Sequence, residues 1–133
     1  MSATMPFALD VLVVDDDPEL GDILVCGLAL DGYRATSVCG AADALRYLRR
    51  PRMPLPKLIV LDVLMPGMDG WAFRAEQRKD RALAAIPVIL LTPAAGGTHL
   101  GADAAGHLVK PFGLDALLAA VGRTLATAPM TGT

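Results

Sequence analysis

LIVLDVLMPGMDG, residues Leu58–Gly70, begins with four apolar residues in a row and then reaches an aspartate, Asp62. A continuous apolar run is typical of a strand that is covered on both faces of a sheet, because a strand with one wet face alternates apolar and polar residues. Pro66 and the glycines around it then predict a turn before the next helical pattern. The stretch therefore predicts a buried parallel strand that carries an acid at its carboxyl end.

Further short apolar runs lie along the chain, and helical patterns separate them. The predicted strands are Leu9–Val14, Tyr33–Val38, Leu58–Leu61, Val88–Leu91 and His107–Val109. The helical patterns are PELGDILVCGLAL, AADALRYLRR, GWAFRAEQRKD and GLDALLAAVGRTLA. This alternation predicts an α/β domain of three layers, in which a parallel sheet lies between helices and the crossovers are right-handed.

The composition is that of a globular chain of 133 residues, of which 53% are hydrophobic and 20% charged. The formal net charge of −2 predicts no direct binding to nucleic acid. The start lacks the basic and apolar regions of a signal peptide, and the longest apolar run is too short to cross a membrane. We expect a cytoplasmic protein without a membrane partner, in which Cys26 and Cys39 are unpaired and buried.

Polar side chains stand at the ends of four predicted strands. They are Asp15, Asp16 and Asp17 after the first strand, Asp62 after the third, Thr92 after the fourth and Lys110 after the fifth. Because the carboxyl ends of parallel strands meet at one edge of a sheet, we expect these groups to converge. Clustered carboxylates repel one another unless a cation lies among them, and oxygen ligands suit Mg²⁺. A carboxylate beside a metal ion, an ammonium group and a hydroxyl is suited to capture of a phosphoryl group.

Four motifs in this order, VLVVDDDPE, LIVLDVLMPGMDG, VILLT and HLVKPF, resemble those of the receiver domain of bacterial two-component response regulators. The resemblance covers nearly the whole chain. It implies a flavodoxin-like fold, with a five-stranded parallel sheet in the order 2-1-3-4-5 and about five helices. We expect residues 1–128 to form the receiver domain and residues 129–133 to be a tail or the start of a linker.

The resemblance also implies a role for each acid of the site. Asp62 would be the phosphoacceptor. Asp16 would bind Mg²⁺, or Mn²⁺ in its place, directly, and Asp15 would act mainly through water. The backbone carbonyl of Leu64 would complete the protein ligands of the metal. Asp17 is interpreted as structural, because an aspartate followed by proline fits an N-cap before the first helical residue.

The remaining site residues would act on the phosphoryl group or shape the loops around it. By the resemblance, Thr92 and Lys110 would hold phosphoryl oxygens, and Pro111 would follow a cis peptide bond. His107 stands where the family often has an aromatic residue that turns inward on activation. Histidine occurs there in some members, so we interpret His107 equally as a switch residue or as an ordinary strand residue.

Two departures from the family pattern lie near the site. Pro93 follows Thr92 where the family usually has a small residue whose backbone N–H donates to a phosphoryl oxygen, and proline has no N–H. The segment between Thr92 and Lys110 is rich in glycine and about one helical turn shorter than usual. We therefore expect its helix, the fourth of the fold, to be short or disordered and to extend at most over Thr98–Ala105.

The resemblance implies a phosphoacceptor and not an enzyme, apart from self-phosphorylation and self-dephosphorylation. Its partners would be a histidine kinase or histidine phosphotransfer protein, docking near the first helix, and a downstream effector protein or domain. A homodimer is compatible with the sequence. Two alternatives stay open. Pro93 favours an interaction module with weak or no phosphorylation-driven switching. An aspartyl-phosphate phosphatase would need an aspartate where Leu64 stands.

Overall fold

The computed structural model describes residues 9–65, 67–93 and 104–127. Five parallel strands form one sheet in the order β2-β1-β3-β4-β5. Their bounds are β1 Val11–Val14, β2 Ala35–Val38, β3 Leu58–Asp62, β4 Val88–Thr92 and β5 Gly106–Val109. The predicted flavodoxin-like sheet is confirmed, although β1 and β2 begin two residues later than predicted and β3 and β4 end one residue later.

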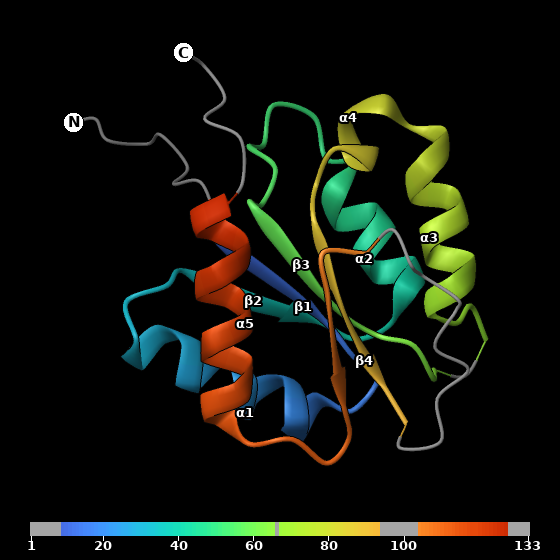
Figure 1. Ribbon diagram of the computed structural model, residues 1–133. Helices are drawn as coiled ribbons and strands as arrows, with labels where there is room; N and C mark the ends of the chain where they lie inside the picture. The colour runs from blue at the N-terminus through green and yellow to red at the C-terminus, as the bar shows by residue number, and fades with distance from the viewer. Residues whose placement is uncertain (1–8, 66, 94–103, 128–133) are drawn as a thin grey trace.

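Helices cover both faces of this sheet. Their bounds are α1 Pro18–Leu30, α2 Ala41–Leu48, α3 Gly70–Lys79, α4 Arg81–Ala84 and α5 Leu114–Thr127. Helices α1 and α5 lie on one face, and α2, α3 and α4 lie on the other (Figure 1). None of the helices in the described ranges is long and apolar enough to cross a membrane.

The sheet separates two apolar cores, because successive side chains of a strand point to opposite faces. In β1, Val11 and Val13 pack toward α1 and α5, whereas Leu12 and Val14 pack toward α2 and α3. All four side chains are fully buried. Burial on both faces explains why the central strands are continuous apolar runs in the sequence.

Helix α1 begins and ends at the residues that the sequence indicates. The carboxylate of Asp17 accepts hydrogen bonds from the backbone N–H groups of Glu19 and Leu20, at 3.0 and 3.4 Å. The helix starts at Pro18 and ends before Asp31, and Gly32 follows with a φ of +94°. The prediction of Asp17 as an N-cap is confirmed, and its carboxylate is occupied by these hydrogen bonds to the start of α1.

The predicted fourth helix and the described α4 are different segments. The predicted one, at most Thr98–Ala105, lies outside the described residues except for its last two, which are not helical. Helix α4 instead precedes β4, and Asp80 begins it by accepting hydrogen bonds from the N–H groups of Ala82 and Leu83. The sequence analysis placed Asp80 at the end of a helix and did not predict that a second short helix starts there.

The two cysteines correct one prediction. Cys26 and Cys39 are free, as predicted, but both are exposed, so the prediction that they are buried is wrong. Helix α1 carries apolar residues on more than one face, and its pattern therefore did not separate the buried face from the exposed one. Cys39 follows β2, and its thiol donates to the carbonyl oxygen of Asp16 at 3.3 Å.

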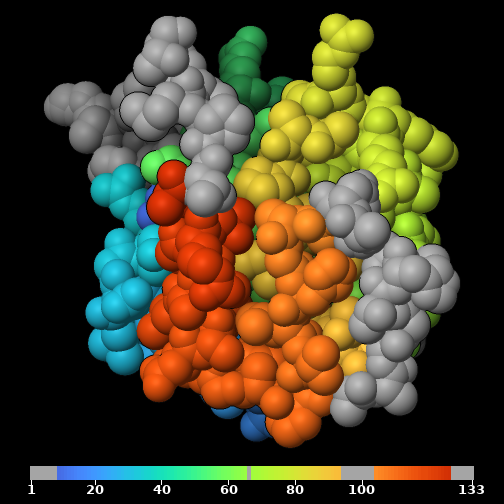
Figure 2. All heavy atoms as spheres, viewed as in Figure 1, coloured from blue at the N-terminus to red at the C-terminus, as the bar shows by residue number. Residues whose placement is uncertain are grey.

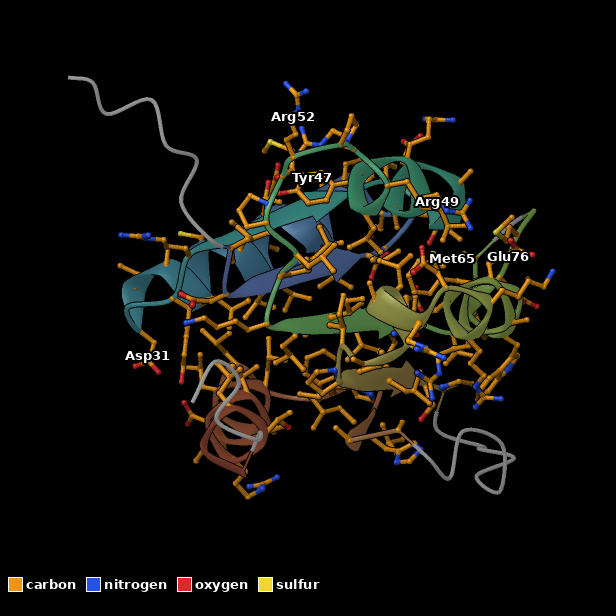
Figure 3. All side chains as sticks on the ribbon, turned by 90° about the horizontal axis from the view of Figure 1, so that it is seen from above. Asp31, Tyr47, Arg49, Arg52, Met65 and Glu76 are labelled. Atoms are coloured by element: carbon orange, nitrogen blue, oxygen red, sulfur yellow. The ribbon has the colours of Figure 1, made fainter. Side chains whose placement is uncertain are left out.

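Helices α2 and α3 are joined at the surface by charged side chains. A guanidinium nitrogen of Arg49, the residue directly after α2, lies 3.5 Å from a carboxylate oxygen of Glu76 on α3, and the two side chains face one another in Figure 3. Lys79 lies 2.8 Å from the other carboxylate oxygen and lowers the pKa of Glu76 by its hydrogen bond. Solvent screens such exposed pairs, so they contribute little to stability.

Candidate functional site

Three carboxylates lie together at the carboxyl edge of the sheet. One carboxylate oxygen from each of Asp15, Asp16 and Asp62 lies within 4.8 Å of the others. Asp15 and Asp16 directly follow β1, and Asp62 ends the neighbouring strand β3. The parallel pairing of these two strands therefore brings together acids that are far apart in the chain, as the sequence predicts.

Asp62 is held by one neutral and one cationic donor. Its side chain is 4% exposed. The backbone N–H of Leu64 donates to Oδ1 at 3.1 Å, and the Lys110 Nζ lies 3.2 Å from Oδ2. The backbone N–H of Lys110 donates to the carbonyl of Thr92 at 2.8 Å, which fixes this lysine at the same edge of the sheet. The two contacts orient both oxygens of the Asp62 carboxylate.

Asp15 is buried and only partly satisfied. The backbone N–H of Asp17 donates to its Oδ1 at 2.8 Å, but its Oδ2 has no hydrogen-bond partner among the described residues. Burial raises the pKa of Asp15 from 3.8 to about 6, the Asp17 N–H opposes this rise, and the charge of Asp62 adds to it. A buried carboxylate oxygen without a donor is costly unless a cation lies beside it.

The acids fit a hard divalent cation. Asp15, Asp16 and Asp62 offer only carboxylate oxygens, which suit Mg²⁺ or Mn²⁺ better than zinc. The unsatisfied Oδ2 of Asp15 supplies an oxygen that no donor of the described chain uses. Mg²⁺ keeps several of its waters and needs few protein ligands, so three carboxylates on one side are enough to hold it.

Thr92 and Pro93 lie beside this cluster at the end of β4. Thr92 is 7% exposed, and its hydroxyl donates to the carbonyl oxygen of Leu108 on β5 at 3.4 Å. The hydroxyl is thus turned toward β5. Pro93 and Lys110 both line a neighbouring groove. The end of β4 therefore offers one hydroxyl at the edge of the sheet that carries the acids but, at Pro93, no backbone donor.

The other predicted site residues lie in different places. The peptide bond between Lys110 and Pro111 is cis, as the resemblance implies. His107 is exposed on β5 and lines a hollow of about 250 Å³ with Arg123 and Thr124, away from the carboxylates. Pro66 lies outside the described residues.

An apolar groove of about 530 Å³, with Lys110 in its lining, lies between α1 and the connection from β5 to α5. Its lining residues are Leu20, Ile23, Leu24, Pro93, Lys110, Pro111, Phe112 and Leu114. The segment from β5 into α5, orange in Figure 2, lies at the surface. Ile23 is 62% exposed and Leu114 is 39% exposed. The sequence analysis missed this groove, although apolar residues on more than one face of α1 were a signal for it.

The match to known sequences covers most of the chain. Residues 11–122 match the response regulator receiver domain. The DNA-binding dual master transcriptional regulator RpaA of Synechocystis sp. is 33% identical over 117 residues, which are 84% of this chain and 46% of that protein. The chain thus spans about half the length of the curated relatives that it matches.

Solved receiver domains have the same fold. The signal receiver domain of a signal transduction histidine kinase from Syntrophus aciditrophicus superposes with a TM-score of 0.81 and 33% identity, over 95% of this chain and 96% of that one. The receiver domain of the sensor histidine kinase PA1611 from Pseudomonas aeruginosa, which has a magnesium ion coordinated in its active site cleft, gives 0.73 and 26%, over 91% and 100%. With its strand order and its three converging acids, this chain belongs to the response regulator receiver domains of two-component signal transduction.

Proposed function

We propose that this chain accepts a phosphoryl group on Asp62, with Mg²⁺, from a histidine kinase or a histidine phosphotransfer protein. The observation that carries the proposal is the setting of Asp62, which lies 3.2 Å from Lys110 and within 4.8 Å of the oxygens of Asp15 and Asp16. Three clustered carboxylates repel one another, so their cluster is unfavourable unless the site has a function. Metal-assisted phosphoryl transfer is a function that uses all three.

The residues have separate roles in this transfer. A carboxylate oxygen of Asp62 attacks phosphorus, a P–O bond forms, and the P–N bond of the donor phosphohistidine breaks with its electron pair going to the imidazole. Lys110 neutralises charge on the transferred oxygens, and the Thr92 hydroxyl leaves the Leu108 carbonyl to donate to one of them. The backbone N–H of Leu64 holds the attacking carboxylate in place.

Asp15, Asp16, Asp62 and the backbone carbonyl of Leu64 would hold the metal. When bound, Mg²⁺ neutralises charge on both the carboxylates and the phosphoryl oxygens. The magnesium ion in the active site cleft of the PA1611 receiver domain supports this choice of ion. The unsatisfied Oδ2 of Asp15 supports it independently.

The groove beside α1 fits a helix of the phosphodonor partner. It is apolar, and residues 1–33 contain no Lys or Arg, so a helix with apolar residues flanked by basic ones is complementary to it. Such a partner would meet this chain in the cytoplasm. Ile23→Glu should slow transfer from a phosphohistidine protein and leave labelling by a small phosphodonor unchanged. Equal rates of protein-dependent transfer in the variant and the wild type would count against this docking site.

The proposal is tested by incubation with Mg²⁺ and acetyl phosphate, followed by intact mass. The wild type should gain the mass of one phosphoryl group, and the gain should disappear when the metal is chelated. Asp62→Ala should not be labelled, whereas Asp31→Ala, which removes an exposed acid at the far end of α1, should be labelled like the wild type. Equal labelling of Asp62→Ala and the wild type would refute the assignment of Asp62.

Pro93 favours a second candidate function, an interaction module that keeps the fold but switches weakly or not at all. The residue removes a backbone donor next to Thr92, which is one contact that could couple the phosphoryl group to a change of shape. Amide chemical shifts with and without beryllium fluoride distinguish the two functions. Shifts confined to the residues around Asp62 would favour the interaction module, and shifts that spread along β4 and β5 would favour a switch.

The output of the chain is also a proposal. RpaA is named as a DNA-binding transcriptional regulator, and this chain matches less than half of it. We propose that residues 1–128 form the receiver domain, that residues 129–133 are a tail or linker, and that an effector protein or domain reads the phosphorylated surface. The chain's own chemistry would be limited to gaining and losing its phosphoryl group.

A further inference from the structure

The first residue of α3 lies against the backbone of the proposed phosphoacceptor. A Cβ atom on Gly70 would stand 2.7 Å from the Cα of Val63 and 2.8 Å from the carbonyl oxygen of Asp62. Cβ atoms essentially never approach other heavy atoms this closely. The backbone N–H of Gly70 also donates to the carbonyl oxygen of Val63 at 2.9 Å. The absence of a side chain at Gly70 therefore allows α3 to begin directly on the end of β3.

Neither side of this contact can move away freely. On α3, Phe73 is fully buried in the core, and Gln77 holds the carbonyl oxygens of Leu83 and Ile86. On the strand side, the backbone N–H of Val63 donates to the carbonyl of Leu91 at 3.0 Å. A methyl group at Gly70 would meet backbone on both neighbours, so no side-chain rotation can relieve the contact.

The strand end is the side where a shift matters for chemistry. Val63 lies between Asp62, which bears the reacting carboxylate, and Leu64, whose N–H donates to that carboxylate. Helix α3 is fixed along its length by Phe73 and Gln77, whereas the chain beyond Val63 leaves the sheet. The displacement should therefore fall on the chain just beyond Val63, where the N–H of Leu64 holds the Asp62 carboxylate. A catalytic carboxylate tolerates only about 0.5 Å of displacement before its geometry is lost.

We propose that Gly70 is a positioning residue for phosphoryl capture. Because Gly70 has no side chain, α3 can pack directly against the backbone of Asp62 and Val63. This packing fixes the position of the Asp62 carboxylate relative to Lys110, Asp15 and Asp16. The inference rests on the proposed function of Asp62 and assigns to Gly70 a part in it. A substitution at a second glycine with an equally close contact, Gly27, distinguishes an effect on the site from an effect on packing alone.

Gly27 on α1 is the matched control. A Cβ atom there would stand 2.6 Å from a methyl carbon of Leu114 on α5. Gly27→Ala thus introduces the same group at a tight helix contact that is remote from the acids. It meets the far end of a flexible side chain, so it should change the melting temperature less than Gly70→Ala does, and it leaves the backbone of the phosphoacceptor in place.

The test measures Mn²⁺ binding by electron paramagnetic resonance and thermal unfolding for the wild type, Gly70→Ala and Gly27→Ala. Mn²⁺ binding needs no phosphodonor. Gly70→Ala should weaken Mn²⁺ binding by about tenfold, the size of effect expected when an outer-shell partner of a metal site is changed. It should also slow acetyl phosphate labelling at saturating metal. Gly27→Ala should bind Mn²⁺ like the wild type.

Equal Mn²⁺ affinity in Gly70→Ala and Gly27→Ala would overturn the proposal. If Gly70→Ala is unfolded in buffer, all three proteins are compared in trimethylamine N-oxide, which favours the compact state. Failure to fold there as well would show a purely structural role and also overturn it. A wild type that binds Mn²⁺ but is not labelled by acetyl phosphate would refute phosphoryl capture while the metal measurement still reports on Gly70.

Discussion

Asp15 and Gln77 are both buried polar side chains, and their surroundings differ in one respect. The Nε2 of Gln77 donates to the carbonyl oxygens of Leu83 and Ile86 at 2.7 and 3.1 Å, and its Oε1 accepts from Arg74 at 3.1 Å. Asp15 has a partner for one carboxylate oxygen and, within the described chain, none for the other. The fold satisfies the polar atoms of Gln77, whereas within the described chain it leaves one carboxylate oxygen of Asp15 without a donor.

This difference separates a structural polar group from a functional one. Gln77 ties α3 to α4 and to the turn before β4, and nothing remains for a ligand to contact. Asp15 keeps an unsatisfied oxygen and a raised pKa, which cost stability and persist in proteins where a site needs them. Substitution of Gln77 should therefore lower stability and leave metal binding unchanged. Substitution of Asp15 should raise stability and weaken metal binding.

The largest effect is expected at Gln77. Gln77→Leu would leave the carbonyl oxygens of Leu83 and Ile86 buried without a donor, which should lower the free energy of unfolding by about 3–4 kcal/mol. Urea unfolding measures the change. Mg²⁺ affinity should stay at the wild-type value. Glu76→Gln, at the half-buried neighbouring position, should change stability little. A stable Gln77→Leu with weakened Mg²⁺ binding would reverse the proposed division of roles.

Asp15→Asn should have the opposite effect on stability. It removes a buried charge whose pKa is raised to about 6, so the metal-free protein should gain about 2 kcal/mol in free energy of unfolding at neutral pH. It should lose Mg²⁺ affinity, because an amide replaces a carboxylate ligand. Asp22→Asn, an exposed acid on α1, is the control and should change neither quantity. A destabilised Asp15→Asn would mean that its unsatisfied oxygen is not a cost.

Pro93→Ala tests whether the site lacks a backbone donor for the phosphoryl group. The substitution restores a backbone N–H beside Thr92, and a charge-assisted hydrogen bond should raise the affinity for beryllium fluoride by about tenfold. Fluorescence or calorimetric titration in the presence of Mg²⁺ measures it. Pro51→Ala, at an exposed turn after α2, is the control. Unchanged affinity would show that the missing donor is not used by the phosphoryl group.

The smallest effect concerns pH. Since the pKa of Asp15 is raised in the folded state, that state binds more protons than the unfolded chain between pH 4 and 6, and the free energy of unfolding should fall as pH rises through this range. Protons also compete with metal, so Mg²⁺ affinity should fall about fourfold from pH 7.5 to 5.5. Both slopes should be smaller in Asp15→Asn. Parallel curves for the two proteins would assign the titration to another group.

The sheet and most of the site could be predicted, because few residues determine them. Continuous apolar runs identified the central strands, and the convergence of parallel strand ends placed Asp62 near Asp15 and Asp16. The family resemblance supplied the strand order. Local chemistry was also sufficient for Asp17, whose capping role depends only on its neighbours in the chain.

The remaining features depend on packing that one sequence does not encode locally. Asp15 and Asp16 follow the same strand, yet only the three-dimensional surroundings leave an Asp15 oxygen without a donor. Gln77 looks like an ordinary surface residue of a polar helix, and its burial follows from the short helix that Asp80 begins. Gly70 was predicted as a turn residue, and its contact with Val63 requires the position of α3 on the sheet.

The sheet divides the interior into two cores, and this division affects which substitutions can accumulate independently. Among the described residues, the core beneath α1 and α5 shares no buried side chain with the core beneath α2 and α3. Substitutions in the two cores should therefore combine additively, as they do at sites without shared partners. Lineages could change the helix of the proposed docking groove while the opposite side of the domain stays untouched. Paralogues within one cell could thus acquire separate partners without redesign of the acids at the sheet edge.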